Sequence, residues 1–463
     1  MKLISLLLLS LLSLPSFSQS TFSPENVLGY KIGKQFTPHD KVVDYFNTLQ
    51  VAYPKQVRIE TYGKTNEQRQ LYVAIIASEE NLARLEEIRL NHRNGVATEN
   101  SAIVWLSYNV HGNESCGTEA AMQTAFELLS KRNELLKNTI VIIDPCLNPD
   151  GRERYVNYYR QYGPKINNPN RSAAEHNEPW PGGRSNHYLF DLNRDWAWLT
   201  QVESKQRIQL YNQWLPHVHV DFHEQAINEP YFFPPAAEPY HEVITPWQRE
   251  FQIEIGKNHA KYFDQAGWLY FSKETFDLLY PSYGDTYPTF NGAIGMTYEQ
   301  GGSGRAGLSV LTNTYDTLTL YDRVLHHVTT GISTLEVSAK MSKKLVEEYQ
   351  GFVKNKNYNF KSFILDGKSP NLNALLKLMD LHGIQYKSTV PMTTVKGFDY
   401  FSSQEGTYKT KEGDIVISTN QLKGTLVNVL FEPKTKLKDS LTYDLSAWSL
   451  PYAYGISTIA STK

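Results

Sequence analysis

The feature that most constrains the fold is a set of short, almost continuously apolar segments separated by stretches of helical periodicity. Two of these segments are "AIVWLSYNV" at 102–110 and "TIVIIDPCL" at 139–147. Apolar runs of this length are typical of strands that are buried on both faces of a sheet. A helix is predicted between them, over 117–131. The pattern therefore predicts an α/β fold in which a mixed, mostly parallel central sheet has helices on both faces.

Further elements continue this alternation to about residue 350. Hydrophobic periodicity and turn residues predict strands at 57–65, 70–78, 217–225 and 292–300, and helices at 38–52, 201–214, 246–266 and 316–350. The motif "NPDG" at 148–151 is expected to form a tight turn after a buried strand. Residues 151–190 are rich in Asn, Pro, Gly, Tyr and Arg. They are expected to form long loops, which are usually functional within a compact domain.

A second, smaller unit is predicted to begin near residue 355, where the alternation restarts. The segments "KSFILDG", "NLNALLKLMDLHG" and "IQYKSTV" indicate a strand, a helix and a strand, and "GDIVIST" and "TLVNVLFEP" indicate further strands. We therefore expect a main domain over 19–350 and an accessory α/β domain over 356–463. The final residues, "STIASTK", show no clear closing element, which leaves open that the chain is a shortened form of a longer one.

The N-terminus has the composition of a secretory signal peptide. Lys2 precedes an apolar stretch at 4–14 and a small-x-small sequence at 16–18, so cleavage is expected before Gln19. The apolar stretch is too short for a stable transmembrane helix, and no later stretch is long and apolar enough to cross a bilayer. We therefore predict that residues 1–18 are removed and that the protein is exported, to the periplasm or the extracellular space, without a membrane span.

Charge and cysteine content limit the classes of partner and of cross-link. The 463-residue chain has a formal net charge of −2 with both signs interspersed, and it has no glycine-rich phosphate-binding loop. This pattern gives no electrostatic basis for binding nucleic acid or an anionic membrane surface. For the two cysteines, Cys116 and Cys146, the sequence leaves two interpretations open: a disulfide formed in an oxidising compartment, or two buried thiols. Oligomeric state is likewise left open.

The first candidate site residues lie between a predicted strand and a predicted helix. His111 and Glu114, in "NVHGNESCGTEA", stand three apart at a strand end, where the sites of α/β sheets gather. A catalytic zinc takes three protein ligands and keeps one position open, so this pair is a candidate for two of them. Two polar residues at a helix start are the alternative. His223, in "DFHE" at another strand end, is the candidate third ligand, with His219 on the same face of that strand as its competitor.

Five motifs in a fixed order extend this site. "HGNE" at 111–114 is followed by "NPDG" at 148–151, "DLNRDW" at 191–196, "DFHE" at 221–224 and "TYE" at 297–299. In this order the motifs resemble those of the zinc carboxypeptidase family, of the carboxypeptidase A type, and the chain is similar to secreted bacterial members. The resemblance covers roughly residues 38–335.

The resemblance implies roles around one zinc ion. His111, Glu114 and His223 would hold the Zn²⁺. Asp191 would orient the first zinc histidine and fix its tautomer; an aspartate that caps a loop is the alternative. Glu299 would act as general base on a zinc-activated water and then protonate the leaving amine; a glutamate that turns to solvent as the strand ends is the alternative.

The resemblance also implies residues that bind the substrate. Asn193 and Arg194 would clamp the free C-terminal carboxylate, a task that suits the planar fork of arginine. A surface salt bridge to Asp195 is the alternative for Arg194. Asp285 lies near the position where this family lines its specificity pocket. It would either select a basic side chain or cap the turn, and the structural role is preferred.

Two further positions are assigned more loosely. The arginine that polarises the scissile carbonyl is expected shortly after "NPDG", and Arg160 is chosen over Arg154 and Arg171. A tyrosine from the loop before the final strand would close over the substrate, and Tyr280 and Tyr283 are both candidates.

We therefore predict a secreted zinc metallocarboxypeptidase, with residues 19–350 as its catalytic domain, that hydrolyses the C-terminal bond of peptides or proteins. Two alternatives remain. One is a zinc amidase or carboxypeptidase that acts on peptidoglycan stem peptides in a cleft shaped by the loop at 155–190. The other is a catalytically inactive peptide-binding relative, against which the presence of His111, Glu114, His223 and Glu299 argues.

Overall fold

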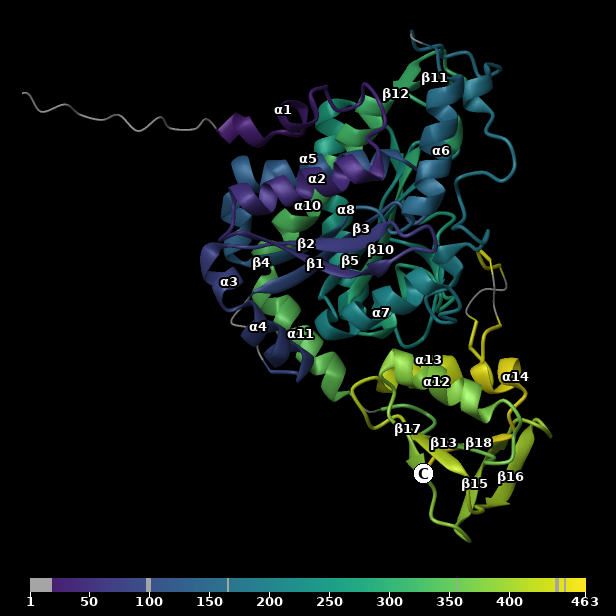
Figure 1. Ribbon diagram of the computed structural model, residues 1–463. Helices are drawn as coiled ribbons and strands as arrows, with labels where there is room; N and C mark the ends of the chain where they lie inside the picture. Colours follow the sequence, from purple (N-terminus) through teal and green to yellow (C-terminus); the bar gives the residue numbers. More distant parts are fainter. Residues whose placement is uncertain (1–18, 97–100, 165, 356, 438–440, 445–446) are drawn as a thin grey trace, which may run out of the picture.

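The computed structural model describes residues 19–463 except 97–100, 165, 356, 438–440 and 445–446 (Figure 1). The predicted signal peptide, residues 1–18, lies outside the described residues. No helix in the described part of the chain combines the length and the apolar character that a membrane span requires.

A central sheet of eight strands organises the larger part of the chain. The strands are β1 (Val57–Lys64), β2 (Gln70–Ile76), β3 (Ala102–Tyr108), β4 (Thr139–Asp144), β5 (Val218–Gln225), β6 (Tyr231–Phe232), β8 (Tyr270–Phe271) and β10 (Ile294–Gly301). Their order is β1-β2-β4-β3-β5-β10-β6-β8. The central strands β4, β3, β5 and β10 run parallel, and β1, β2 and β6 add antiparallel pairs. The predicted mixed, mostly parallel sheet is confirmed.

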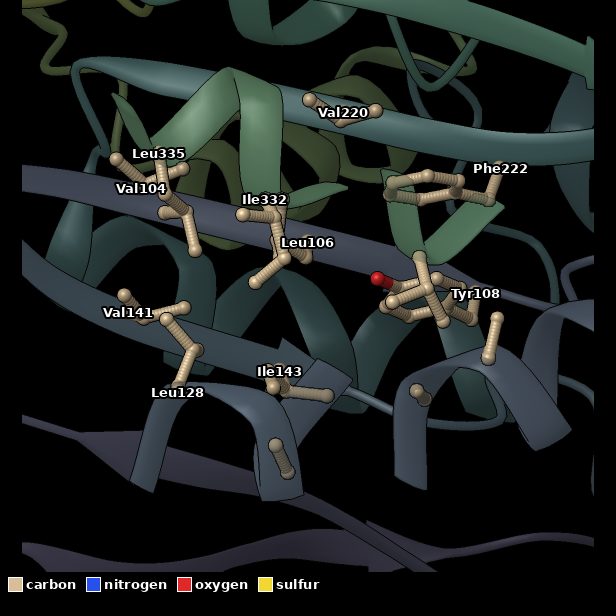
Figure 2. Packing of buried hydrophobic residues seen from close by; sticks show 14 of the residues in the cluster. Val104, Leu106, Tyr108, Leu128, Val141, Ile143, Val220, Phe222, Ile332 and Leu335 are labelled. Carbon is tan, nitrogen blue, oxygen red and sulfur yellow. The ribbon is translucent and has the colours of Figure 1, made fainter. Parts of the chain in front are cut away.

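Helices cover both faces of this sheet (Figure 1). One face carries α2 (His39–Ala52), α5 (Cys116–Ser130), α8 (Pro246–Ala266) and α10 (Leu320–Lys340), and the other carries α4 (Leu85–Arg93) and α7 (Val202–Trp214). Val104 and Leu106 of β3 point toward α5 and α10 (Figure 2), whereas Ile103 and Trp105 pack in the hydrophobic cluster of the opposite face. Burial on both faces explains why the strand shows no polar alternation.

Short elements connect these layers. They are α1 (Pro24–Leu28), α3 (Glu79–Ala83), α9 (Thr286–Phe290), β7 (Ala237–Tyr240), β9 (Asp277–Leu278), β11 (Ser309–Leu311) and β12 (Thr317–Thr319).

Part of the region predicted as long loops is a helix. α6 spans Pro149–Tyr162, and the predicted turn at 148–151 is its first turn. Asn148 is the N-cap residue, and its Oδ1 accepts a hydrogen bond from the Gly151 N–H at 3.0 Å. An N-cap asparagine followed by proline is also a helix-start signal, so the prediction of a tight turn was wrong. Among the described residues of 163–190, only a 3₁₀ helix at Ala174–His176 is regular.

The predicted helix at 316–350 is two helices. α10 begins at a capping box, in which Thr319 and Asp322 each accept a hydrogen bond from the other's backbone N–H. It ends at Lys340, and α11 (Ser342–Lys354) follows after Met341. The first residues of the predicted range fall in and before β12 instead.

A second sheet of six antiparallel strands lies in the C-terminal part of the chain. Its strands are β13 (Ser362–Leu365), β14 (Lys387–Ser388), β15 (Thr394–Asp399), β16 (Gln404–Lys409), β17 (Ile415–Ser418) and β18 (Thr458–Ser461), in the order β14-β17-β13-β18-β15-β16. The helices are α12 (Leu372–His382), α13 (Gly424–Phe431) and α14 (Leu450–Tyr454).

Two predictions for this unit were wrong. The segment "TLVNVLFEP" contains α13 rather than a strand, because a helix that is buried all round is as uniformly apolar as a buried strand. The final residues do contain a closing element, since β18 lies between β13 and β15 in the sheet.

The smaller unit packs against the face of the main sheet that carries α7. Leu375 of α12 and Val427 of α13 belong to the same hydrophobic cluster as Trp105 of β3. Polar contacts join the units as well, among them Tyr287 Oη with His382 Nδ1 at 2.8 Å. The division of the chain into two domains stays a prediction, and this shared core places the C-terminal residues beside the larger unit.

Lys423, just before α13, generates a prediction about this junction. Its buried amino group donates hydrogen bonds to Asn212 Oδ1 of α7 at 2.8 Å and to Asn291 Oδ1 at 2.7 Å. Burial lowers the pKa of Lys423 from its ordinary 10.5 to about 7. Between these two pH values the unfolded chain holds a proton that the folded chain lacks, so the free energy of unfolding rises with pH in that window.

The Lys423→Met variant lacks this titration. From pH 7 to pH 9 the stability of the wild type relative to the variant should therefore increase, by roughly 2 kcal/mol. Urea unfolding followed by tryptophan fluorescence measures this difference. A difference that stays constant between pH 7 and pH 9 would contradict the buried, neutral state of Lys423.

Candidate active site

The candidate site lies at the carboxyl ends of three neighbouring strands. β5 and β10 pair in parallel with Glu299 directly opposite His223, and β3 ends three residues before His111. A cavity of about 200 Å³ opens there. It is lined by His111, Glu114, Arg184, Asn193, Arg194, His223, Glu224, Gln225, Phe276, Asp277, Tyr283, Asp285, Thr297, Glu299 and Tyr443.

Three side chains converge in this cavity with the geometry of metal ligands. His111 Nδ1 lies 2.8 Å from Glu114 Oε1, and His223 Nδ1 lies 3.1 Å from Glu114 Oε2. The two Nδ1 atoms are 3.3 Å apart. All three residues are buried, and one ligand atom from each lies within 4.8 Å of the others. The structure thus brings together the three predicted ligands.

In each histidine ring, the nitrogen that faces away from Glu114 contacts another carboxylate. Asp191 Oδ1 lies 3.0 Å from His111 Nε2, and Asp221 Oδ2 lies 2.9 Å from His223 Nε2. A carboxylate accepts an N–H at Nε2, which leaves the Nδ1 lone pair of each ring facing Glu114. Two imidazole nitrogens and a carboxylate at one point are a donor set that zinc enzymes use. The residues therefore fit a Zn²⁺ ion, and Asp221 is a supporting residue that sequence reasoning missed.

The pKa shifts of the two carboxylates that contact His111 agree with this arrangement. Burial alone would raise the pKa of Glu114, but the charges and hydrogen bonds of His111 and His223 lower it well below its ordinary range. For Asp191, too, the effect of burial is outweighed, because His111, Arg184 and Arg194 lower its pKa. Both carboxylates are therefore ionised at neutral pH and able to interact with a cation.

Glu299 lines the same cavity as a half-buried residue whose Oε2 atom is buried. Its Oε2 has no hydrogen-bond partner among the residues that the structure describes. Burial raises the pKa of Glu299 to about 8, with His223 opposing the shift and Glu114 adding to it. A buried carboxylate oxygen without a partner is costly, which argues against the alternative in which Glu299 turns to solvent. The role of Glu299 as general base stays a prediction.

Asn193 and Arg194 reach the cavity from a 3₁₀ helix, η4 (Leu192–Arg194), that Asp191 caps. Asn193 Oδ1 accepts a hydrogen bond from the Gly284 N–H at 2.8 Å, and its Nδ2 lies 3.3 Å from His223 Nε2. The Arg194 guanidinium lies over the Tyr283 ring, 4.5 Å from the centroid. Asp191 thus both caps η4 and contacts His111. A capping role and a role in orienting this histidine are therefore compatible.

The structure does not place Arg160 in the cavity. Its guanidinium donates to the Phe36 carbonyl at 3.4 Å, because α6 directs the side chain toward the N-terminal segment. The other two arginines considered are also engaged elsewhere, Arg154 by the Gly182 carbonyl and Arg171 by the Leu311 carbonyl.

Arg184 lines the cavity beside the ligand group, and sequence reasoning missed it. Its guanidinium donates to Asp191 Oδ2 at 2.9 Å and to Glu114 Oε1 at 3.4 Å. Its carbonyl accepts hydrogen bonds from Gly112 N and Asn148 Nδ2. The preceding Gly183 permits this close approach, since a Cβ there would lie 2.7 Å from the Gly151 carbonyl oxygen. In the sequence, the Gly182-Gly183 pair was the feature that could have indicated this close approach of the chain and therefore the position of Arg184.

The two candidate tyrosines have different positions. Tyr283 lines the cavity, whereas Tyr280 is buried and its hydroxyl accepts a hydrogen bond from Trp198 Nε1 at 2.6 Å. Asp285 also lines the cavity, and its Oδ2 accepts a hydrogen bond from Thr297 Oγ1 at 2.9 Å. Burial raises the pKa of Asp285 to about 6.

His219, the competing ligand, lies away from the cavity. It is fully buried among Trp105, Trp196 and Tyr211, and burial lowers its pKa to about 3. Position along β5 therefore separates His219 from His223, as expected from the rule that sites lie at strand ends. Both cysteines are free and buried, which supports the thiol interpretation over the disulfide.

A second group of potential ligands lies on the surface side of α6. Glu67, Asp150 and His187 are close enough to hold an ion. Arg69 Nη1, however, donates to Glu67 Oε2 at 2.5 Å and to Asp150 Oδ1 at 2.8 Å. The guanidinium of Arg69 already pairs with both carboxylates, so we interpret this group as an ion-pair network.

The comparisons with known proteins agree with the first site. A sequence profile described as zinc carboxypeptidase matches residues 42–228, so this part of the chain is similar to the zinc carboxypeptidase family. Carboxypeptidase D of Mus musculus is 31% identical over 117 residues, which cover 24% of this chain and 8% of that protein. Probable carboxypeptidase 2 of Arthroderma benhamiae is 27% identical over 124 residues, which cover 26% of this chain and 18% of that protein. The matched segments span less than a fifth of these relatives.

Solved structures with similarity to the chain include two carboxypeptidases. The metallo-carboxypeptidase from Burkholderia cenocepacia is 14% identical with a TM-score of 0.45, covering 65% of this chain and 69% of that one. Carboxypeptidase A from Helicoverpa armigera is 16% identical with a TM-score of 0.43, covering 71% and 76%.

Removal of a ligand should abolish metal binding at this site. His223→Gln is expected to lower Zn²⁺ affinity by about 100-fold or more, because loss of even a supporting residue of a zinc site costs on the order of 10- to 100-fold. Metal content after dialysis against a zinc buffer measures this effect. His187→Gln is the matched control and should keep one zinc ion per chain. Zinc retained by His223→Gln and lost from His187→Gln would assign the metal to the second group instead.

Proposed function

We propose that this protein is a zinc-dependent metallocarboxypeptidase that hydrolyses the last peptide bond of peptides with a free C-terminus. The observation that supports it best is that one cavity contains both parts of such a site. The ligand group of His111, Glu114 and His223 and the carboxylate of Glu299, whose Oε2 has no partner among the described residues, line this cavity. The guanidinium of Arg194 lines the same cavity.

His111, Glu114 and His223 would hold the zinc. Zn²⁺ bound there supplies Lewis acidity, which polarises a carbonyl and lowers the pKa of water. Glu299 is then the base: its carboxylate takes a proton from the water that attacks the scissile carbonyl carbon. As the C–N bond breaks, Glu299 returns a proton to the leaving nitrogen. Burial raises the pKa of Glu299 to about 8, which lets its carboxyl group accept and return a proton near neutral pH.

Two arginines would bind the substrate on either side of the bond. Arg194, with Asn193 beside it, presents the planar donor fork that suits a terminal carboxylate. Arg184 stands next to Glu114, where a donor can stabilise negative charge that develops on the carbonyl oxygen. Asp285 is proposed to favour a basic side chain at the last position of the substrate, because it is an acid in the cavity wall with one oxygen bound to Thr297.

The peptidoglycan alternative is not favoured. It relied on an extended loop over 155–190, and the first eight residues of that range belong to α6. The inactive binding protein is not favoured either, since the three ligands converge and Glu299 lies beside them. Export to the periplasm or the extracellular space stays part of the proposal and depends on the sequence of residues 1–18.

Glu299→Gln should abolish cleavage while metal binding is retained. Loss of the general base is expected to lower kcat on the order of 10²- to 10⁴-fold. The test is mass spectrometry of a peptide library with free C-termini and of the same library amidated, with and without chelator. The wild type should release single residues from the free library only, and chelator should stop it. Cleavage of the amidated library at an equal rate would contradict a carboxypeptidase.

Arg184→Ala and Arg160→Ala form a matched pair. Arg184→Ala is expected to lower kcat/KM about 100-fold, the usual effect of removing one donor to a developing oxyanion. Arg160→Ala should change kcat/KM by less than about two-fold, because its side chain points away from the cavity. The reverse order of effects would restore Arg160 to the role that the sequence first indicated.

A further inference from the structure

The C-terminal unit contributes one residue to the wall of the cavity and a carboxylate that contacts Arg194. Tyr443 lines the cavity, and Asp444 supplies the carboxylate. The Asp444 Oδ2 atom lies 2.9 Å from Arg194 Nη2 and accepts a hydrogen bond from Arg194 Nε at 3.1 Å. The same oxygen accepts a hydrogen bond from the Tyr283 hydroxyl at 2.8 Å. A carboxylate from 250 residues farther along the chain thus occupies the donors of Arg194.

Asp444 occupies the Nε/Nη2 edge of Arg194, which is an edge that offers two parallel donors to a carboxylate. Its Nε and Nη2 face Asp444, and its Nη1 faces Asp191 Oδ2 at 3.8 Å and the Asn193 carbonyl at 3.5 Å. Asp191 itself is shared with His111 and Arg184. A guanidinium binds one carboxylate well through two donors on the same edge. A second carboxylate at this position would have to displace the first.

The segment that carries Asp444 is held beside the cavity. The Tyr443 backbone N–H donates to Asp277 Oδ2 at 2.8 Å. The Tyr443 ring packs against Phe276, with centroids 5.3 Å apart, and lies 6.3 Å from the Tyr283 ring. These contacts do not involve the Asp444 side chain. Its carboxylate can therefore leave Arg194 while the segment keeps its backbone position.

We propose that Asp444 is an internal occupant of the carboxylate position on Arg194, and that a substrate binds by exchanging its terminal carboxylate for that of Asp444. This proposal rests on the proposed carboxypeptidase function. Asp444 contacts the guanidinium that would take the terminal carboxylate, and its carboxylate contacts are with Arg194 and Tyr283, not with the three zinc ligands or Glu299. Its effect is therefore on binding. Asp444 makes the site selective for C-termini that compete successfully for Arg194.

The exchange predicts a specific kinetic signature. The Asp444 side chain is 34% exposed, so its ion pair with Arg194 is weak enough to be displaced by a bound substrate. In Asp444→Asn the competing charge is gone, while the amide keeps the size of the side chain. The KM for a peptide with a free C-terminus should fall about five-fold or more, and kcat should stay within about two-fold. A residue that only tied the two units together would leave KM unchanged or raise it.

The experiment compares Asp444→Asn and Asp444→Ala with Asp380→Asn, which removes an exposed aspartate at the end of α12. Steady-state cleavage of an N-acylated dipeptide gives KM and kcat, and thermal unfolding shows that each variant is folded. A lower KM in both Asp444 variants, with no change in Asp380→Asn, is the expected result. An unchanged or higher KM in the folded Asp444 variants would overturn the proposal.

A binding measurement separates this proposal from the proposed function. In the zinc-loaded Glu299→Gln background, calorimetry gives the Kd of the same dipeptide as free acid and as amide, with and without Asp444→Asn. The expected result is tighter binding of the acid only, by about five-fold or more. If the wild type cleaves no peptide, the proposed function is refuted. The binding measurement would still show whether a terminal carboxylate competes with Asp444 for Arg194. Equal Kd values for the acid in both backgrounds would overturn the exchange itself.

Discussion

The parallel pairing of β5 with β10 is the constraint on which the site depends. It sets Glu299 opposite His223, and the parallel pairing of β3 with β5 brings the loop of His111 and Glu114 to the same edge. Because all three strands are buried on both faces, a slip of one residue would move every side chain to the opposite face. The same packing that makes the strands uniformly apolar therefore fixes the relative positions of the ligands.

Several acidic side chains lie at this edge of the sheet. Only some of their oxygen atoms have a basic or hydrogen-bonding partner in the protein. Glu114 and Asp191 are paired with histidines and arginines, but Glu299 Oε2 and Asp285 Oδ1 have no hydrogen-bond partner among the described residues. Both carboxyl groups have a raised pKa, in each case chiefly because of burial. Buried carboxylates of this kind are retained where a cation or a reaction uses them. The carboxylate oxygens without partners thus indicate a metal-dependent reaction, as does the geometry of the three ligands.

The sequence predicted the parts of the site that lie at strand ends, since apolar strands and adjacent polar residues are local signals. His111, Glu114, His223 and Glu299 were placed in this way. Arg184 was missed because a chain reversal carries it to the cavity, and only the close packing of Gly183 marks that reversal. The contribution of Asp444 could not be predicted either, because it depends on how the second sheet packs on the first. The apolar α13 was taken for a strand for a related reason, as periodicity vanishes in a helix buried on all sides.

The central claim is that His111, Glu114 and His223 form a zinc site at the end of the sheet. Anomalous diffraction at the zinc edge, from crystals grown with Zn²⁺, tests it most directly. The account predicts one strong peak about 2.0–2.2 Å from His111 Nδ1, His223 Nδ1 and a Glu114 carboxylate oxygen. A peak at Glu67, Asp150 and His187 with none between the two histidines would contradict it.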